Sequence, residues 1–385
     1  MRILVAMSGG VDSSAVCLLL QEQGYEVVGM TMRVWDLPRQ FAHAANANGT
    51  LPACPQGQVA DATLEPDFIL SARTLAERLG IEHHVVDVRT EFRDTVVRYF
   101  LDEYEAGRTP NPCVLCNRAF KFRLLAELAD RLGCPLMATG HYVQTQEQDG
   151  HTYLLMGDDV RKDQSYFLWR VPQEVLGRMR FPLGTMEKPA VRAYLDSRGF
   201  ALRAQQAESM EVCFVENDYR DFLRQQRSEM AARVNGGSYV DTGGKRLGTL
   251  QGVPFYTIGQ RKGLGIALGQ PAYVLRLNAE KNTIVLGSEA DLTTQHLLVE
   301  SLECVCQKEL LENEQLTVRI RYHSQPVSCR IQALDDGRHL VSTTESVSAV
   351  SPGQSAVFYI GRRLVGGAII ASQRGIGGIL CSMHN

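Results

Sequence analysis

Residues 8–13 combine small, hydroxyl and acidic side chains directly after an apolar segment. The loop has the sequence Ser8-Gly9-Gly10-Val11-Asp12-Ser13. Adjacent glycines let the backbone approach a ligand closely, and successive N–H groups at the start of a helix bind phosphate. Ser8 and Ser13 add hydroxyl donors, and the Asp12 carboxylate suits Mg²⁺. A capped tight turn is the alternative, but the combination favours a phosphate site.

Three of the ten cysteines form a second group with chemical potential. Cys113 and Cys116 have Cys-x-x-Cys spacing before a helix expected near Asn117, and Cys213 lies far along the chain. A helix start favours a thiolate. Three chemistries stay open beside an incidental pair: persulfide sulfur transfer with a resolving thiol, an iron–sulfur (4Fe–4S) cluster with three cysteine ligands, and structural zinc. Zinc lacks an obvious fourth ligand. We interpret Cys304 and Cys306 as alternate faces of a strand.

The elements that position these residues alternate between strand and helix in the first half of the chain. The expected strands are residues 3–7, 26–32, 83–88 and 136–139, and the expected helices are 13–23, 68–79, 92–104 and 118–132. This alternation predicts an α/β fold with a parallel sheet covered on both faces. Residues 36–65 are rich in Pro, Ala, Asn and Gly, so we expect a mobile surface loop there.

The second half of the chain is β-rich. Glycine pairs and short Val, Ile and Thr runs begin after about Tyr219, with expected strands at 273–277, 283–286, 316–322, 327–334 and 356–359. Short strands of this kind predict a small β-barrel. We therefore expect domains at residues 1–217, 218–290 and 291–373, followed by a loose tail at 374–385.

Composition narrows the class of protein. The 385 residues are 44% hydrophobic and 22% charged, as in an ordinary globular protein. No apolar run reaches the roughly 18–20 residues of a membrane span, and the segment before the glycine loop is too short for a secretory signal. We expect a cytoplasmic location, where cysteines stay reduced. The net charge is −3, but residues 218–288 hold ten basic and five acidic residues, which favours binding to a phosphate backbone.

Several segments together resemble one family. The 8–13 loop lacks the lysine of the common P-loop and resembles the SGGxDS loop of ATP pyrophosphatases, which split ATP between the α and β phosphates. The chain as a whole resembles the tRNA-specific 2-thiouridylase family, in segments that follow the expected order. These segments are residues 6–14, 107–117, 138–142, 162–168, 181–184, 212–214, 257–265 and 351–359.

The resemblance implies an ATP pyrophosphatase domain, a small central tRNA-binding domain and a C-terminal β-barrel. It also implies a mechanism: ATP with Mg²⁺ adenylates the C2 oxygen of the wobble uridine, and sulfur then replaces that oxygen. Cys213 would carry a persulfide from a cysteine desulfurase or a sulfur-relay protein, and Cys116 would resolve it. Such thiol chemistry suits a nucleophilic donor with a second thiol in reach.

The resemblance further assigns contacts residue by residue. Nucleotide contacts would fall on Ala6, Met7, Ser8, Gly9, Gly10, Val11, Asp12, Ser13, Met32 and Gly140. Contacts to the target base would fall on Asn111, Pro112 and Cys113. Other tRNA contacts would fall on His141, Lys162, Asp163, Gln164, Arg321, Tyr322 and Gln354. A single-stranded anticodon base can be splayed into such a pocket, and Arg321 with Tyr322 on a strand would suit phosphate contact and stacking.

The chain departs from the family pattern at a few positions. Some members carry Asp where this chain has Cys113; a thiol there is a weaker acid–base group and favours the cluster interpretation. The segment 207–211 lacks the usual Lys and Gly, Leu250 replaces a common His, and residues 36–65 have no clear counterpart. The alternatives are therefore a divergent paralogue acting as an iron–sulfur or RNA-binding protein, or another ATP pyrophosphatase without a need for Cys213.

Overall fold

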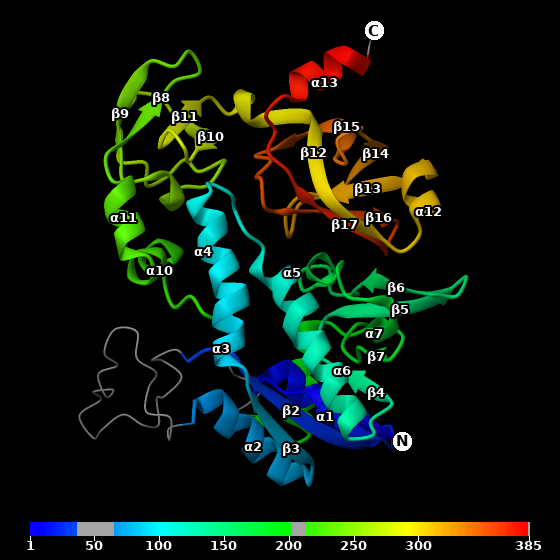
Figure 1. The fold of residues 1–385 in the computed structure, drawn as a ribbon. Helices are drawn as coiled ribbons and strands as arrows, with labels where there is room; N and C mark the ends of the chain where they lie inside the picture. Colours follow the sequence, from blue (N-terminus) through cyan, green and yellow to red (C-terminus); the bar gives the residue numbers. More distant parts are fainter. Residues whose placement is uncertain (37–64, 202–211, 384–385) are drawn as a thin grey trace, which may run out of the picture. The chain divides into compact units, whose positions relative to one another are not determined.

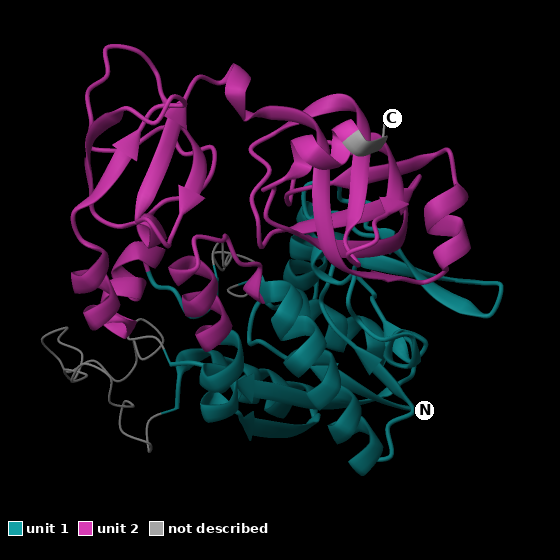
Figure 2. Ribbon diagram, turned by 45° about the horizontal axis from the view of Figure 1, so that its top comes forward, with its two compact units in different colours: residues 1–96, 113–216 teal, residues 97–112, 217–385 magenta. Residues whose placement is uncertain are grey.

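The computed structural model describes residues 1–36, 65–201 and 212–383 (Figure 1). The expected 36–65 loop and the altered 207–211 segment therefore lie almost wholly outside the described residues. The described chain divides into two compact units (Figure 2). Unit 1 holds residues 1–96 and 113–216, and unit 2 holds residues 97–112 and 217–385.

Unit 1 is built on a five-stranded sheet in the order β3-β2-β1-β4-β7. Its strands are β1 (Arg2–Ala6), β2 (Glu26–Arg33), β3 (Glu82–Asp87), β4 (Leu136–Ala138) and β7 (Met179–Arg180). Every neighbouring pair is parallel. The chain leaves β1 for β2 on one side and places β4 on the other, so the strand order reverses beside β1. Ligands of open parallel sheets bind at the carboxyl ends of strands around such a point.

Helices cover both faces of this sheet. The main ones are α1 (Val11–Glu22), α2 (Asp67–Leu79), α6 (Phe122–Arg131) and α8 (Lys188–Ser197). Ile3 and Val5 of β1 share one buried cluster with residues of α1, α2 and α8. Leu4 is fully buried but outside that cluster, because successive strand residues face opposite ways. The contacts of α6 with β1 and β4 place it on the second face. The predicted α/β fold is confirmed.

Shorter elements of unit 1 carry most of the remaining candidate residues. They are α3 (Arg89–Phe92), a π-helical turn (Arg93–Val97), α5 (Pro112–Cys116), a second π-helical turn (Asn117–Lys121), β5 (Val143–Gln148), β6 (His151–Met156), a 3₁₀ turn (Ser165–Phe167) and α7 (Gln173–Leu176). The helix expected at 92–104 is thus interrupted by a π-helical turn, and the helix expected at 118–132 begins with one. Such turns occur often at functional sites.

Unit 2 begins with α4 (Arg98–Glu105), which the sequence had assigned to the first domain. The other elements of its first part are α10 (Tyr219–Gln226), α11 (Ser228–Val234), β8 (Gly237–Val240), β9 (Arg246–Leu250), β10 (Tyr273–Asn278) and β11 (Thr283–Gly287), with sheet order β10-β11-β8-β9. Tyr104 stacks on Tyr219 at 4.5 Å between ring centroids, and Phe100 meets Phe222 edge-on at 6.1 Å. These aromatic contacts tie α4 to the residues after 217.

The C-terminal part of unit 2 is a closed antiparallel barrel, which confirms the predicted β-barrel. Its strands, in spatial order, are β12 (Thr293–Cys304), β15 (His339–Ser348), β14 (Val327–Ala333), β13 (Leu316–Arg319), β16 (Ser355–Ile360) and β17 (Arg363–Ile370). Pairing of β12 with β17 closes the ring. The helix α12 (Gln307–Glu312) follows β12.

The expected loose tail is wrong for most of its length. Residues 376–383 form α13 (Ile376–Met383). Ile376, Ile379 and Leu380 pack against a buried cluster that includes Leu298 and Leu340, and burial of apolar area stabilises a short helix that would not form alone.

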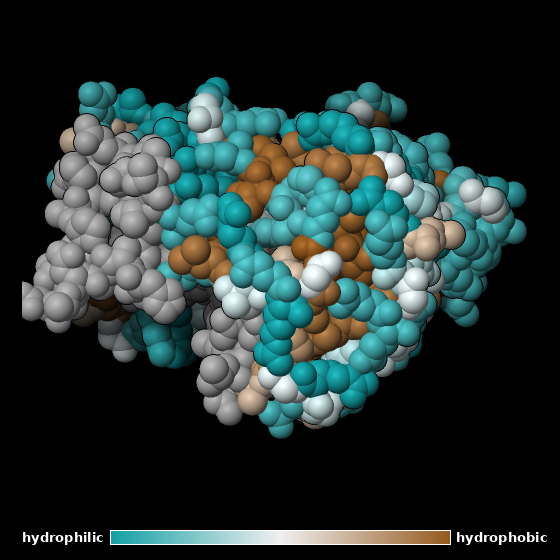
Figure 3. Space-filling view, turned by 90° about the horizontal axis from the view of Figure 1, so that it is seen from below, coloured by the Kyte–Doolittle hydropathy of each residue, from teal (hydrophilic) through white to brown (hydrophobic). Residues whose placement is uncertain are grey.

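The described surface shows few large hydrophobic side chains. Among the described residues, the large hydrophobic side chains that are exposed are those of Met1, Leu70, Val160 and Leu311. On the face drawn in Figure 3, apolar surface is broken up by hydrophilic side chains. Among the described residues, no helix has the length and apolarity that a membrane crossing needs.

Candidate active site

The glycine loop links β1 to α1 at the carboxyl edge of the sheet. Gly9 has φ +73°, and a Cβ there would lie 2.3 Å from the Phe68 carbonyl oxygen, so only glycine fits. Ser71 Oγ donates to the Gly9 carbonyl at 2.9 Å and fixes the turn. Gly10 is the N-cap of α1 and, as a glycine, has no side chain that could occupy the N–H groups there. The first N–H groups of α1 also lack helical acceptors, so the loop presents backbone donors suited to phosphate.

Two serines complete the donor set of this loop. The Ser8 N–H donates to Ser13 Oγ at 3.2 Å, and the two hydroxyl groups lie 3.3 Å apart. Ser13 is 3% exposed while Ser8 is exposed. Ser13 therefore shapes the loop, and Ser8 faces outward as a hydroxyl donor. The chemistry of these residues fits a bound polyphosphate.

Other predicted nucleotide positions converge on the same edge. Ala6 ends β1, and Met32 is the penultimate residue of β2. Gly140 follows β4, and a Cβ there would lie 3.0 Å from Asp12 Cβ. Close approach to the loop thus explains the glycine. The parallel sheet brings together residues separated by more than 100 positions in the sequence.

Asp12 differs from the sequence expectation. Its two carboxylate oxygens accept bonds from Lys188 Nζ at 2.7 and 2.8 Å, and Oδ1 also accepts from the Tyr142 hydroxyl at 2.7 Å. The predicted Mg²⁺ ligand therefore carries an ammonium partner in this structure. The sequence pattern does not indicate Lys188 or Tyr142, because nothing local in the sequence signals a contact such as that of Lys188 with Asp12, 176 positions away.

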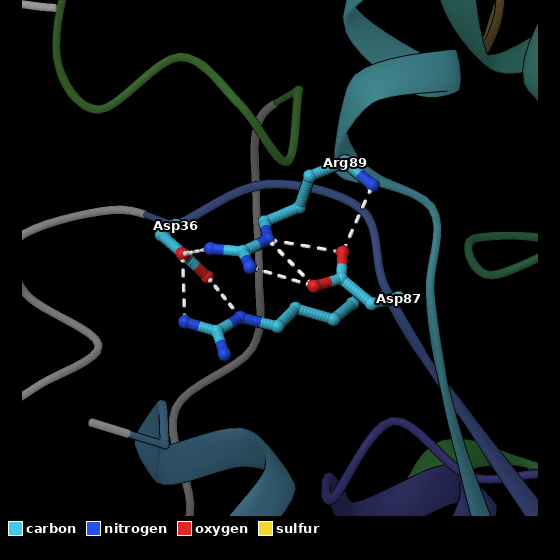
Figure 4. A network of polar contacts seen from close by, with 4 residues as sticks. Asp36, Asp87 and Arg89 are labelled. Atoms are coloured by element: carbon cyan, nitrogen blue, oxygen red, sulfur yellow. Dashed lines mark hydrogen bonds and ion pairs between the residues drawn. The ribbon is translucent and has the colours of Figure 1, made fainter. Parts of the chain in front are cut away.

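A charged network closes the ends of β2 and β3 (Figure 4). Asp36 accepts two bonds from Arg33, at 2.9 and 2.8 Å, and one from Arg89 at 2.6 Å. Arg89 also contacts Asp87 at 2.6 Å, and its bonds hold the pKa of Asp87 below the ordinary value. Asp36 and Arg33 side chains are only 9% and 8% exposed. This network fixes the chain just beyond Met32.

The helix that carries the first two cysteines begins earlier than expected. It starts at Pro112 instead of near Asn117, because proline suits the first helical position. Cys113 and Cys116 therefore lie within its first turns. Asn117 continues the helix and donates from Nδ2 to the Phe167 carbonyl at 2.9 Å, which joins the cysteine helix to the 162–168 segment.

The third cysteine is held by an aromatic anchor. Phe214, the next residue, is 1% exposed and meets Phe92 at 5.7 Å and Trp35 at 6.3 Å between ring centroids. Cys213 itself is exposed. Its thiol is electrostatically coupled to those of Cys116 and Cys113. Unit 1 thus brings the three predicted cysteines into one neighbourhood.

The thiols of this neighbourhood are not activated in the resting protein. Burial is the main cause that raises the pKa of Cys116 to about 11 and that of Cys213 to about 12, and it also raises the pKa of Cys113. The expected thiolate at the helix start is therefore wrong for this state, since loss of hydration outweighs the helix end. Although Cys113 and Cys213 reach the surface, the surrounding protein replaces much of the water around their sulfurs.

Lys121 is a further residue of this neighbourhood that the sequence did not reveal. Its ammonium lowers the pKa of all three thiols and of His141, so it lies within electrostatic reach of each. It ends the π-helical turn that follows Cys116. A cation at this point favours any anionic sulfur that forms.

The predicted tRNA residues of unit 1 have different environments. Burial lowers the pKa of His141 well below its ordinary value, so the ring is neutral near pH 7, and its Nδ1 lies 2.7 Å from Thr139 Oγ1. Gln164 Oε1 accepts from the Tyr142 N–H at 3.0 Å. Lys162 is half-buried. His141 and Gln164 therefore keep polar atoms near the carboxyl end of β4.

Asp163 serves the fold instead of the surface. It is 2% exposed and accepts bonds from the Gly157 N–H, the Ser165 N–H and the Ser165 hydroxyl. These bonds occupy a buried carboxylate, as burial of a charge requires. A direct side-chain contact between Asp163 and tRNA, as the sequence implied, disagrees with this burial.

The predicted tRNA residues of unit 2 lie near two loops. Gln354 Nε2 donates to the carbonyls of Thr109 and Pro110 at 3.3 and 3.0 Å, so the barrel loop supports the segment that leads to Asn111 and Pro112, both buried. Arg321 and Tyr322 are not on a strand, because β13 ends at Arg319. They form a turn in which the Ser324 hydroxyl bonds to Arg321.

The basic segment of unit 2 is partly neutralised. Arg220, Arg224, Arg227 and Arg233 pair with carboxylates of α4 or of their own helix region. The other basic residues are exposed and have no ion pair with any described residue; they are Lys245, Arg246, Arg261, Lys262, Arg276 and Lys281. The cationic surface therefore belongs to the β8–β11 sheet and its loops.

A preformed metal centre is not evident in the part of the chain that the structure describes. No group of three or more His, Cys, Asp or Glu side chains there is arranged to hold a metal ion. The iron–sulfur cluster on Cys113, Cys116 and Cys213 stays a prediction.

Comparison with known families covers nearly the whole chain. Residues 1–217 match the tRNA methyl transferase HUP domain, 220–288 the tRNA methyl transferase PRC-barrel domain and 294–370 the aminomethyltransferase beta-barrel domain. A tRNA-specific 2-thiouridylase MnmA 3 of Phocaeicola vulgatus is 54% identical over 97% of this chain and 96% of the relative.

Two relatives from one strain of Bacteroides fragilis show where the chain lies within this group. It is 52% identical to tRNA-specific 2-thiouridylase MnmA 3, over 98% of this chain and 96% of the relative. It is 38% identical to tRNA-specific 2-thiouridylase MnmA 1 of the same strain, over 96% of this chain and 97% of the relative. Identity at these levels across whole chains, joined to the loop and cysteine geometry, shows that the chain belongs to the tRNA-specific 2-thiouridylase family.

Proposed function

We propose that this protein catalyses ATP-dependent 2-thiolation of the wobble uridine of tRNA. The observation that carries the proposal is the position of the SGGxDS loop and of Cys113, Cys116 and Cys213 in one unit. Activation of an oxygen and delivery of sulfur are two halves of one reaction, and the chain has residues for each. The names of its relatives supply the substrate class.

The nucleotide half of the reaction rests on the loop after β1. The N–H groups at the start of α1, with the hydroxyl of Ser8, bind the phosphates of ATP. Magnesium, when bound, would neutralise developing charge on those phosphates, with Asp12 as the carboxylate in reach. The C2 oxygen of uridine attacks the α-phosphorus, and pyrophosphate leaves. The oxygen becomes part of an AMP leaving group.

The sulfur half rests on the thiols. Cys213 carries a persulfide supplied by a cysteine desulfurase or a sulfur-relay protein. The terminal sulfur attacks C2, and AMP leaves with the former uridine oxygen. Cys116 then attacks the Cys213 sulfur, which releases the thiolated base and leaves a Cys116–Cys213 disulfide that an external thiol reduces. Lys121 stabilises the anionic sulfur at each stage.

Residues of each unit are proposed tRNA contacts. The target base is expected to contact Asn111, Pro112 and Cys113, and His141, Lys162 and Gln164 are further proposed tRNA contacts. Arg321, Tyr322 and Gln354 are proposed contacts from the barrel. The cationic β8–β11 surface suits the phosphate backbone, and its contribution should weaken as salt rises.

The test is a reconstituted reaction with purified protein, tRNA, ATP, Mg²⁺ and a cysteine desulfurase with cysteine. We expect tRNA-dependent AMP and pyrophosphate, and 2-thiouridine in the digested tRNA by mass spectrometry. Cys213→Ser should form no 2-thiouridine, whereas Cys306→Ser, outside the site, should match the native protein. A folded protein that binds tRNA but never forms AMP would refute the proposal.

A further inference from the structure

Lys188, at the start of α8, contacts the nucleotide loop directly. Its ammonium lies 2.7 and 2.8 Å from the two Asp12 oxygens. The Tyr142 hydroxyl donates to the same carboxylate at 2.7 Å. Lys188 is 7% exposed. A buried lysine aimed at a phosphate loop is a costly arrangement unless its charge is used or paired.

The protein fixes this lysine at both ends. Lys188 begins α8, and its N–H donates to Asp159 Oδ2 at 3.0 Å. Asp159 is itself 5% exposed. At the other end, Nζ lies 5.7 Å from the centroid of the Tyr142 ring. Packing of α8 on α1 in the shared core holds the two helices together. The ammonium is therefore preorganised beside the loop.

This geometry gives Asp12 two competing cations. A carboxylate beside bound phosphates attracts a divalent ion, yet here both oxygens already face an ammonium. An ammonium beside the same loop is in turn attracted to any polyphosphate that binds. Binding of a metal–nucleotide therefore allows an exchange of partners: the Asp12 carboxylate would pair with the metal ion, and the Lys188 ammonium with the phosphates.

We propose that Lys188 is a positioning residue that serves as the resident counter-ion of the nucleotide loop. It neutralises Asp12 in the nucleotide-free protein and keeps free divalent ions off that carboxylate. When magnesium–ATP binds, Lys188 releases Asp12 to the metal and turns its ammonium to the phosphates that will leave. The inference rests on the proposed use of ATP and specifies how the loop admits it.

The first test measures metal binding without nucleotide or tRNA. Nucleotide-free protein is titrated with Mn²⁺, and free Mn²⁺ is followed by electron paramagnetic resonance. Lys188→Met should bind Mn²⁺ about tenfold more tightly than the native protein, since the carboxylate loses its competitor. The double variant Asp12→Asn/Lys188→Met should lose that gain. Lys308→Met, on an exposed part of α12, is the matched control.

The second test measures, by calorimetry, the affinity of the protein for inorganic pyrophosphate and for AMP. Lys188→Met should weaken binding of magnesium pyrophosphate about tenfold or more and leave AMP nearly unchanged. Lys188→Arg should retain part of the pyrophosphate affinity, and it replaces Lys188→Met should that variant not fold. Equal Mn²⁺ affinity in native protein and folded variant, or unchanged pyrophosphate affinity, would overturn the inference.

These outcomes are separable from the fate of the proposed function. Failure to form 2-thiouridine with intact Lys188 effects would remove only the proposed reaction. Normal tRNA thiolation with no Lys188 effect on Mn²⁺ or pyrophosphate would remove only the counter-ion role.

Discussion

Alanine substitution of each loop glycine distinguishes a glycine that the loop needs for folding, Gly9, from one that it needs for phosphate binding, Gly10. At Gly9, φ is +73° and a Cβ would lie 2.3 Å from the Phe68 carbonyl oxygen. A left-handed alanine costs about 1–2 kcal/mol, and forcing an atom into packed structure adds about 1–3 kcal/mol. Gly9→Ala should therefore lower the free energy of unfolding of unit 1 by about 2–5 kcal/mol.

Gly10→Ala is the matched control for stability. Gly10 has extended backbone angles, φ −94° and ψ 179°, and a Cβ there would meet only Ser8 Oγ, at 3.5 Å. The substitution should lower stability by only about 0.5–1 kcal/mol, because alanine is a poorer N-cap residue than glycine. It should nevertheless weaken ATP binding, because the new methyl group stands where the phosphates are expected.

Stability is measured by urea unfolding and by hydrogen exchange of the amides of α1 and β1. ATP affinity is measured by equilibrium binding. Equal unfolding midpoints for Gly9→Ala and Gly10→Ala would refute the steric reasoning. Native ATP affinity in a folded Gly10→Ala protein would place the phosphates elsewhere.

Further predictions concern the thiols and the charged network. Iodoacetamide labelling of Cys116 and Cys213, followed by mass spectrometry, should be slow at pH 7 and still rise above pH 9, because their pKa values are about 11 and about 12 and only the thiolate reacts; a plateau below pH 9 would contradict this. Lys121→Met should slow labelling at every pH, since the lost cation leaves the thiol pKa values higher still. Asp36→Asn should destabilise unit 1 by about 2–4 kcal/mol, measured by urea unfolding, whereas Asp336→Asn, in an exposed pair with Arg338, should barely change the midpoint.

Local signals in the sequence determined the alternation of strands and helices in the first half of the chain. Apolar runs at 26–32 and 83–88 became β2 and β3, and glycines at positions such as Gly80 ended helices in the left-handed conformation. The SGGxDS loop could be located because its chemistry lies in consecutive residues. The same holds for Cys113 and Cys116, which share one turn of chain.

The sequence-based predictions were wrong where contacts between residues far apart in the sequence outweigh the local pattern. The tail after residue 374 looked loose, yet it folds as α13 because it finds apolar partners on the barrel. The 316–322 strand ended early, at Arg319, so Arg321 and Tyr322 fall in a turn. Asp163 looked like a surface acid but satisfies three buried donors.

By itself the sequence determined an α/β first half with a glycine-rich phosphate loop, a β-rich second half and three cysteines with chemical potential. Only the tertiary structure decided the electrostatics of those groups. Lys188 neutralises Asp12 from 176 positions away, and Lys121 lies within reach of all three thiols. The physical reason is that charge interactions and desolvation depend on distance and burial, which chain spacing does not encode.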